Sequence, residues 1–440
     1  MTRNVLFCVF LLLLASASAE AQQPAPTLSQ VFEDLFGPNG LVVDSEAVLP
    51  DGSTHSGHFN SAFQSNFEQF DVALASQLAN LPLPSPASGF TYRFDPSTGT
   101  FVRTSQSFGP ILTDRAETIG RGRFSFGYNF QYFSFDKLEG INLASVPSIF
   151  RHDDFQAGGG RADVVSTENA INASVGQWTG ALTYGVTDHF DISVAVPVVR
   201  TSLNVFSAAT IERVGTGPQR NIHFFRDPDA QGEFGSERTF QSGGSASGLG
   251  DVIVRGKSEF LRRGSQGFTG GIDLRLPTGD ERNLLGSGAW GVRPFFAYSA
   301  APGRISPHVN VAYLWNGSSV LAGNPETGEK ADVPDQFQYA IGADFGVNDR
   351  FSITGDWLSR LSIDSPRVKL VSETITGTYG SVTLPDIAFE RSSFWASSAA
   401  VGCKMNAKGR LLVDFNLRFS VNDNGLTDRV TPLIGLEYTF

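Results

Sequence analysis

Twelve segments after residue 120 alternate apolar and polar side chains, which is the period of β-strands with two different faces. The last of them, VTPLIGLEYTF, carries an apolar side chain at nearly every second position from Val430 to Phe440. The candidate strands begin near Arg123, Ser174, Phe190, Gly250, Phe268, Gly291, Ser306, Phe337, Phe351, Ser393, Gly409 and Val430. This pattern predicts an all-β chain.

The connections between these segments fall into two alternating classes. Short, turn-like links lie at residues 187–189, 262–267, 300–304, 348–350 and 406–408. Long polar stretches lie at residues 134–172, 212–248, 277–290, 316–336, 362–391 and 422–429. A soluble β-sandwich could show the same alternation of side chains, but it has no reason to sort its connections by length. Even strand number, short turns at one end and long loops at the other are typical of an outer-membrane barrel, so we predict a transmembrane antiparallel β-barrel of about twelve strands.

The two ends of the chain agree with this location. Arg3 precedes an apolar core from Val5 to Leu14, and small residues then lead to Ala19-Glu20-Ala21, the pattern of a cleaved bacterial signal peptide covering residues 1–21. The final strand ends on aromatic side chains and resembles the C-terminal recognition strand of outer-membrane barrels. We therefore expect Tyr438 and Phe440 to be a membrane-assembly signal read by the barrel-assembly machinery, with outer-membrane lipid around the barrel.

Composition removes several other classes of protein. The 33 basic and 44 acidic residues give a formal charge of -11, which disfavours a nucleic-acid partner. No window of 18 apolar residues follows the signal peptide, so we predict no transmembrane helix. The mature chain keeps only Cys403, so an intramolecular disulfide is excluded.

Residues 22–120 lack the strand pattern and are predicted to be a separate N-terminal extension before the barrel of residues 121–440. Apolar residues at helical spacing predict helices over Thr27–Phe36 and Asn60–Leu81, and Asp95–Gly99 predicts the turn of a hairpin. Such an extension could plug the lumen, lie on the membrane surface or pack in the periplasm. We favour partial occlusion of the barrel, because so many Phe side chains need an apolar surface to cover.

Three short motifs in the barrel carry a family resemblance. They are Glu117–Phe124 (ETIGRGRF), Gly248–Val252 (GLGDV) and Leu276–Asp280 (LPTGD). From about Glu117 to Phe440 the sequence resembles the outer-membrane transporters associated with the meta-cleavage pathway of phenol degradation, and more loosely the long-chain fatty-acid channels for hydrophobic compounds. The resemblance implies a barrel that admits small hydrophobic or aromatic molecules, and it brings no catalytic residue with it.

The alternation also predicts which polar side chains face the lumen. The candidates for lining and selectivity are Arg123, Asp251, Arg255, Lys257, Glu259, Asp273, Arg275, Arg293, His308, Asp344, Asp356, Arg360, Arg410, Asp414, Arg418 and Glu437. Both signs of charge are interspersed, so these residues could select solutes or could form ion pairs that stiffen the wall.

Enzymatic chemistry has little support in this sequence. Twelve-stranded outer-membrane phospholipases exist, but in His308-Val309-Asn310 an Asn stands where the nucleophile is expected, and no G-x-S-x-G motif occurs. The histidines and Cys403 show no metal-ligand spacing. We therefore expect no enzyme, no metal and no cofactor, but an outer-membrane channel for passive uptake of small, hydrophobic or aromatic solutes. The alternative is a non-conducting structural or binding barrel.

Overall fold

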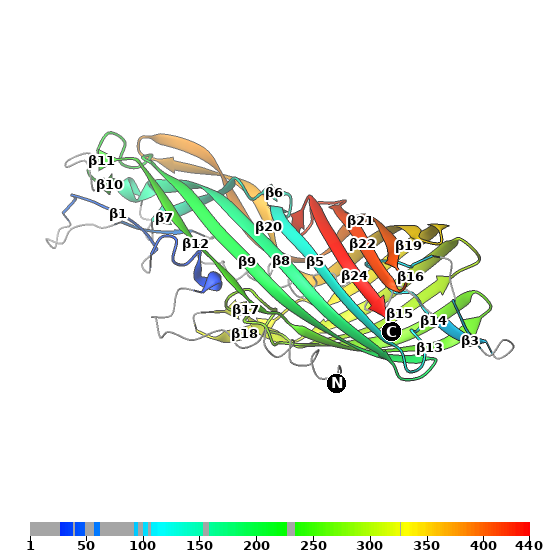
Figure 1. The fold of residues 1–440 in the computed structure, drawn as a ribbon. Coiled ribbons are helices and arrows are strands. Elements are labelled where there is room, and N and C mark those ends of the chain that lie inside the picture. Colours follow the sequence, from blue (N-terminus) through cyan, green and yellow to red (C-terminus); the bar gives the residue numbers. More distant parts are fainter. Residues whose placement is uncertain are drawn as a thin grey trace.

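The computed structural model describes residues 27–37, 40–48, 57–61, 92–95, 100–103, 107–152, 158–226, 234–325 and 327–440. Twelve antiparallel strands form the barrel wall: β5 (Phe124–Leu138), β8 (Val164–Gly185), β9 (Phe190–Glu212), β13 (Val252–Arg263), β14 (Gln266–Leu276), β15 (Gly291–Ala300), β16 (Ile305–Asn316), β19 (Gln336–Asn348), β20 (Phe351–Gly377), β21 (Gly380–Lys408), β22 (Leu411–Ser420) and β24 (Val430–Thr439). Pairing of Thr439 in β24 with Ser125 in β5 closes the wall (Figure 1).

Shorter elements surround the long-loop end of this wall. They are the 3-10 helices η1 (Leu28–Gln30) and η3 (Gly159–Ala162) and the strands β1 (Leu41–Val43), β2 (Gly57–Ser61), β6 (Ile141–Asn142), β7 (Val146–His152), β10 (Phe225–Arg226), β11 (Phe234–Gly235), β12 (Glu237–Leu249), β17 (Ser318–Asn324), β18 (Glu329–Asp332) and β23 (Leu426–Asp428). A separate hairpin pairs β3 (Tyr92–Asp95) with β4 (Thr100–Arg103). Within the described residues, no helix is both long and apolar enough to cross a membrane.

The predicted strand pattern is confirmed, and so is the sorting of the connections. All twelve expected strands are present, and the turns that join β8 to β9, β13 to β14 and β19 to β20 are short. The strand lengths differ from the expectation of about 9 to 11 residues, because β8, β9, β20 and β21 have 22, 23, 27 and 29 residues. Much of the sequence predicted as long loops therefore continues as paired strand.

Strand β9 shows where the membrane belt ends. Its outward side chains are apolar from Ile192 to Val198, and the next outward positions are Arg200, Ser202 and Asn204. From Phe190, where the strand begins, to Val198 there are nine residues of tilted strand, which match the roughly 25 Å apolar band of an outer-membrane barrel. The remaining half of β9 thus projects beyond the bilayer, together with β12, as the upper left of Figure 1 shows.

Aromatic side chains mark both edges of this belt. At the short-turn end, Phe124 packs on Tyr184 with ring centroids 4.6 Å apart, and Tyr438 packs on Phe440 at 4.8 Å. At the other end, Tyr313 packs on Trp315 at 5.0 Å, and Trp395 contacts neighbouring rings of β19. These two groups are the aromatic girdles expected where amphipathic rings meet the headgroup level.

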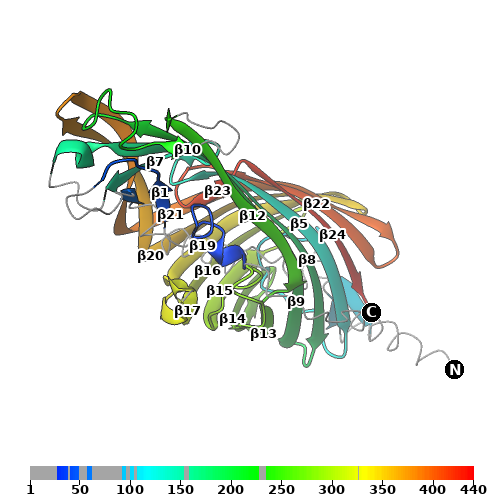
Figure 2. The same cartoon turned by 90° about the vertical axis from the view of Figure 1, so that its left-hand side faces the viewer.

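The described N-terminal residues pack inside the extended strands. Leu28, Val31, Phe32 and Leu35 are buried in one apolar cluster with inward side chains of β5, β8 and β9. Next, β1 pairs with β2 and β2 with β7, and Figure 2 shows β1 among β7, β12 and β20. The inner face of β9 is apolar above the belt because it covers these residues.

The predicted extension is realised only in part. The helix expected over residues 27–36 is a 3-10 turn, Leu28–Gln30, followed by turns to Leu35, although its apolar spacing is buried as the sequence suggested. Of the expected helix Asn60–Leu81, Asn60 and Ser61 belong to β2, and the rest lies outside the described residues. Strands β3 and β4 pair with each other as expected for the hairpin, while residues 96–99 of its turn lie outside the described residues.

A charged substitution on the lipid-facing side of β9 tests the position of the membrane belt. Replacing Val194, an outward residue of β9, with Arg should lower the free energy of unfolding by roughly 2–4 kcal/mol, since a guanidinium near the bilayer midplane is poorly solvated. Ala208→Arg, on the same face of the same strand but beyond Arg200, should change it by less than about 0.5 kcal/mol. Urea unfolding in lipid vesicles measures both, and equal losses would contradict the belt.

Candidate functional site in the barrel lumen

The lumen contains nearly all the charged residues that the alternation assigned to it. Ten are buried in the barrel: Arg255, Lys257, Glu259, Asp273, Arg275, His308, Asp344, Asp356, Asp414 and Glu437. Five are half-buried: Arg123, Asp251, Arg293, Arg360 and Arg418. The inward orientation of His308 follows from its place on β16, where every second residue is buried.

Arg410 was wrongly assigned to the lumen. It lies in the turn between β21 and β22 and is exposed, so the alternation of β22 starts only at the next residue. A turn residue is free of the strand period, which is why extending the pattern by one position failed.

The last part of the predicted extension, for which the sequence indicates no helix or strand, crosses the lumen. Residues Ser107–Gly120 precede β5, and their side chains are buried throughout; Phe108, Ile111 and Ala116 are at most 1% exposed. Phe108 packs on Leu412 of β22, and Ile111 packs near Leu433 of β24. We refer to Ser107–Gly120 as the luminal segment.

Inward polar side chains of the wall bind the backbone of the luminal segment. The N–H of Phe108 donates to Ser352 Oγ at 3.0 Å, and that of Ala116 donates to Ser299 Oγ at 3.0 Å. Three further bonds follow the segment across the barrel: Asp114 N to Asn310 Oδ1 at 2.6 Å, Lys257 Nζ to Glu117 O at 2.7 Å, and Ile119 N to Asp191 Oδ2 at 3.0 Å. Side chains of the wall thus form hydrogen bonds with backbone groups of the luminal segment that are not paired in a helix or a sheet.

Several predicted selectivity residues also contact the side chains of this segment. Asp356 accepts a hydrogen bond from Thr113 at 3.1 Å, and its Oδ1 lies 2.6 Å from His308 Nε2. Asp344 accepts a hydrogen bond from Ser107 and lies 3.9 Å from the guanidinium of Arg115. For these residues the geometry fits the structural interpretation, in which charges hold the interior together.

The C-terminal end of the luminal segment packs closely against the barrel wall. Gly120 has φ +93°, a conformation that glycine adopts easily, and the chain then enters β5. A Cβ at Gly185, in the neighbouring end of β8, would overlap the carbonyl oxygen of Gly120. The two glycines allow the segment to press against the wall at the short-turn end.

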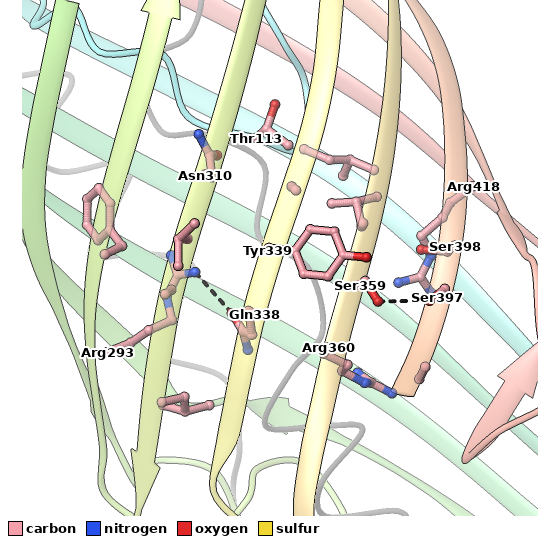
Figure 3. A pocket seen from close by; sticks show the side chains of 18 of the residues that line it. Thr113, Arg293, Asn310, Gln338, Tyr339, Ser359, Arg360, Ser397, Ser398 and Arg418 are labelled. Atoms are coloured by element: carbon pink, nitrogen blue, oxygen red, sulfur yellow. Dashed lines mark hydrogen bonds between the residues drawn. The ribbon is translucent and has the colours of Figure 1, made fainter. Parts of the chain in front are cut away.

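Beside the luminal segment lies a cavity of about 230 Å³. Leu112, Thr113 and Asp114 of the segment contribute one side of it, and the inner faces of β13 to β16, β19 to β22 and the end of β5 contribute the others (Figure 3). Its lining combines charged and apolar side chains, among them Phe133 and Phe295. This cavity is the candidate functional site.

A charge cluster forms one wall of the cavity. Arg255 donates to both oxygens of Asp273, at 2.6 and 2.9 Å, and to Asp114 Oδ1 at 2.7 Å. Arg293 donates to Asp273 Oδ2 at 2.9 Å and to Gln338 at 3.2 Å. The two guanidinium groups also flank the Phe295 ring, 4.8 and 5.5 Å from its centroid. Asp114 therefore ties the luminal segment to the wall of the cavity.

The opposite wall carries Arg360 on β20 and Arg418 on β22. Arg418 donates to Thr431 at 3.0 Å, lies 3.7 Å from Asp428 and covers the Phe133 ring at 5.3 Å. Burial raises the pKa of Asp428, and the nearby charge of Arg418 partly offsets this effect. Figure 3 shows Arg360 and Arg418 beside Ser397 and Ser398, and Ser397 bonds Ser359 at 2.8 Å. Among the described residues no group of His, Cys, Asp and Glu side chains is arranged to hold a metal ion.

Closed antiparallel strands with an apolar belt, two aromatic girdles and a polar lumen define an outer-membrane β-barrel. Residues 151–367 match the family described as "Putative MetA-pathway of phenol degradation", which confirms the family resemblance seen in the sequence. This part of the chain is similar to that family.

Solved structures with a similar chain path are bacterial outer-membrane proteins. The COG4313 outer membrane channel from Pseudomonas putida F1 is 13% identical, with 74% of this chain and 98% of that chain covered and a TM-score of 0.44. A FadL homologue from Pseudomonas aeruginosa is 10% identical, with 82% and 97% covered and a TM-score of 0.32. The CymD monoaromatic hydrocarbon channel is 10% identical, with 73% and 88% covered and a TM-score of 0.27. No curated protein matches the chain.

Proposed function

We propose that the protein is a channel for passive uptake of small aromatic or hydrophobic solutes across the outer membrane. The observation that carries this proposal is the cavity inside the lumen, where the phenylalanine rings lie next to hydrogen-bonding groups. Ligand sites are mostly apolar with a few convergent polar groups, and this cavity has that character. The family described for phenol degradation supports the same class of solute.

The luminal segment determines how wide such a channel can be. A barrel of twelve strands lies between those whose interior is filled by side chains and the open porins of 16 to 18 strands. Here the segment takes up part of an interior that is already narrow. The proposal therefore includes a small conductance and selection at the cavity. Leader cleavage before Gln22 and recognition of Tyr438 and Phe440 during assembly remain part of the same proposal.

Planar-bilayer recording of the refolded mature chain, residues 22–440, tests the proposal. The expected result is a small single-channel current that small aromatic compounds block, because they occupy the cavity. Heat-modifiable migration in gels first establishes that the barrel is folded. A folded barrel that carries no current and passes no toluene into vesicles would remove the transport function.

A specific observation favours the second candidate, a barrel that does not conduct. The luminal segment is buried and bonded to the wall at many points, as expected for a permanent structural filling. In that case the charges around it stabilise the barrel, and the cavity is closed. The same recording separates the two candidates, since only the channel gives a current. The expectation that the protein is not an enzyme stays a prediction.

A further inference from the structure

The short-turn end of the barrel carries an excess of exposed basic side chains. They occur at the β13–β14, β15–β16, β19–β20 and β21–β22 turns and at the entry to β5, the end where the C-terminus lies in Figure 1. We call them the basic rim: Arg121, Arg263, Arg304, Arg350, Lys408 and Arg410. The exposed acidic side chains described at this end are Asp188 and Asp349. The whole chain has a formal charge of -11, so the rim has the opposite sign to the average.

The charge of the basic rim is not neutralised by nearby acidic side chains. Among the residues that the structure describes, none of the six rim cations lies within ion-pair distance of a carboxylate. Exposed cations on the projecting β20–β21 hairpin differ in this respect. There Lys369 lies 3.4 Å from Glu390, and Arg391 lies 3.2 Å from Asp364. The rim therefore presents a positive field to whatever lies next to it.

The basic rim lies at the edge of the membrane belt. Leu261, Ile305 and Met405 are outward apolar residues, 53%, 55% and 47% exposed, and each stands within three residues of a rim cation. Three residues of strand span at most about 10 Å, and less along the membrane normal because the strands are tilted. Long basic side chains at such an edge keep their stems on apolar surface and extend their charged groups to the headgroups.

The composition and the spacing of the rim indicate the chemistry of its partner. Five of the six cations are Arg, whose planar N–H donors match the oxygens of a phosphate. The cations are divided among four turns and the β5 entry, so they follow the circumference of the barrel and do not gather in one patch. This arrangement suits many small anionic groups around the barrel better than one acidic protein.

From these observations we propose that the basic rim is a binding surface for anionic phospholipid headgroups of the leaflet at the short-turn end. The guanidinium groups bind the lipid phosphates, while the outward apolar side chains above them contact the acyl chains. The inference concerns the outer surface of the barrel and is independent of the proposed channel function, since it holds for a conducting and for a closed barrel alike.

Quenching of a fluorophore by brominated lipids tests the rim in the folded mature chain. Cys403 is the only Cys after the predicted signal peptide, and it lies on β21 between outward Val401 and Met405, five residues before Lys408. A fluorophore on Cys403 is measured in phosphatidylcholine vesicles that contain acyl-brominated phosphatidylglycerol or acyl-brominated phosphatidylcholine at the same mole fraction. Phosphatidylglycerol should be preferred about fivefold, which corresponds to about 1 kcal/mol for one basic contact.

Charge-removing variants of the two turns nearest to the label make the test specific. The triple variant Arg350→Gln, Lys408→Gln and Arg410→Gln should lower the preference below about twofold. Arg350→Lys with Arg410→Lys keeps the charges and should keep most of the preference. The matched control is Lys369→Gln with Arg391→Gln, because these exposed cations lie on β20 and β21 beyond the belt and already have acidic partners. The control should leave the preference unchanged.

A salt titration of the native barrel gives a second measurement that needs no variant. The preference should fall toward one at 1 M salt, where the screening length is about 3 Å. Equal quenching by the two lipids in the native barrel, or the same preference in the native and triple-variant barrels, would overturn the inference. Binding of soluble polyaspartate without any lipid preference would also overturn it, because the rim would then bind an acidic macromolecule. Conductance plays no part in these outcomes, so a failed channel proposal leaves this test intact.

Discussion

Asp273→Asn should lower the free energy of unfolding by about 3 kcal/mol, because it leaves buried guanidinium groups without their main carboxylate. Asp273 is 6% exposed and receives hydrogen bonds from Arg255 and Arg293. The Asn side chain is similar in size but carries no charge. Asp114 would remain as the only carboxylate, among the residues that the structure describes, that is bonded to Arg255.

The measurement is urea unfolding in lipid vesicles, followed by the shift between folded and unfolded bands on gels. Asp364→Asn provides the control, because that side chain is 70% exposed and its pair with Arg391 lies in water. Surface pairs contribute little, so the control should lose less than about 1 kcal/mol. If both variants lost the same stability, the charge cluster would have no special role, and water in the lumen would be screening it.

The barrel could be predicted from the sequence because lipid and lumen impose opposite requirements on alternate residues of every strand. Lipid selects apolar side chains at Ile192, Val194 and Val196, and the lumen accepts Asp191 and Ser193 between them. The same contrast also placed His308 and Asp344 in the interior. Among the predicted lumen residues, the pattern gave the wrong orientation only for Arg410, because this residue lies in a turn where the strand period stops.

The extended strands were harder to find because they leave the lipid. Between Glu237 and Leu249, β12 consists largely of Ser, Gly, Thr and Gln, which have no strong alternation. Its pairing with β9 fixes it as a strand, through contacts between residues far apart in sequence. Local patterns contain no information about such a partner, so the sequence predicted a loop there.

The luminal segment was hidden for a different reason. Its backbone is bonded to wall side chains and not to a regular ladder, so Ser107–Gly120 has no period that could be recognised. Some of the wall residues that bind it, such as Asp356 and Lys257, were predicted to be polar and inward, but their partner was not. Asp356 and Lys257 look equally suited to bind solutes or to hold a segment of the chain, and only the fold shows the second arrangement.

Replacing residues 108–116 with a Gly-Ser stretch of the same length should raise the single-channel conductance at least about threefold, because the interior of a twelve-stranded barrel would then be largely open. The replacement removes the apolar contacts of Phe108 and Ile111 and the bond between Asp114 and Arg255, so the new stretch has little to hold it against the wall. The inward charges that it leaves behind can be solvated by water entering the lumen.

Planar-bilayer recording of both barrels measures this effect, after gel migration has established that the variant is folded. The same Gly-Ser replacement over residues 373–381, at the tip of the β20–β21 hairpin, is the control and should leave the conductance unchanged. An equal current in native and segment-replaced barrels would mean that the luminal segment is not the constriction. A larger current that small aromatic compounds no longer block would show that the segment also forms the cavity, since Leu112, Thr113 and Asp114 contribute one of its sides. Width and selectivity would then depend on the same nine residues.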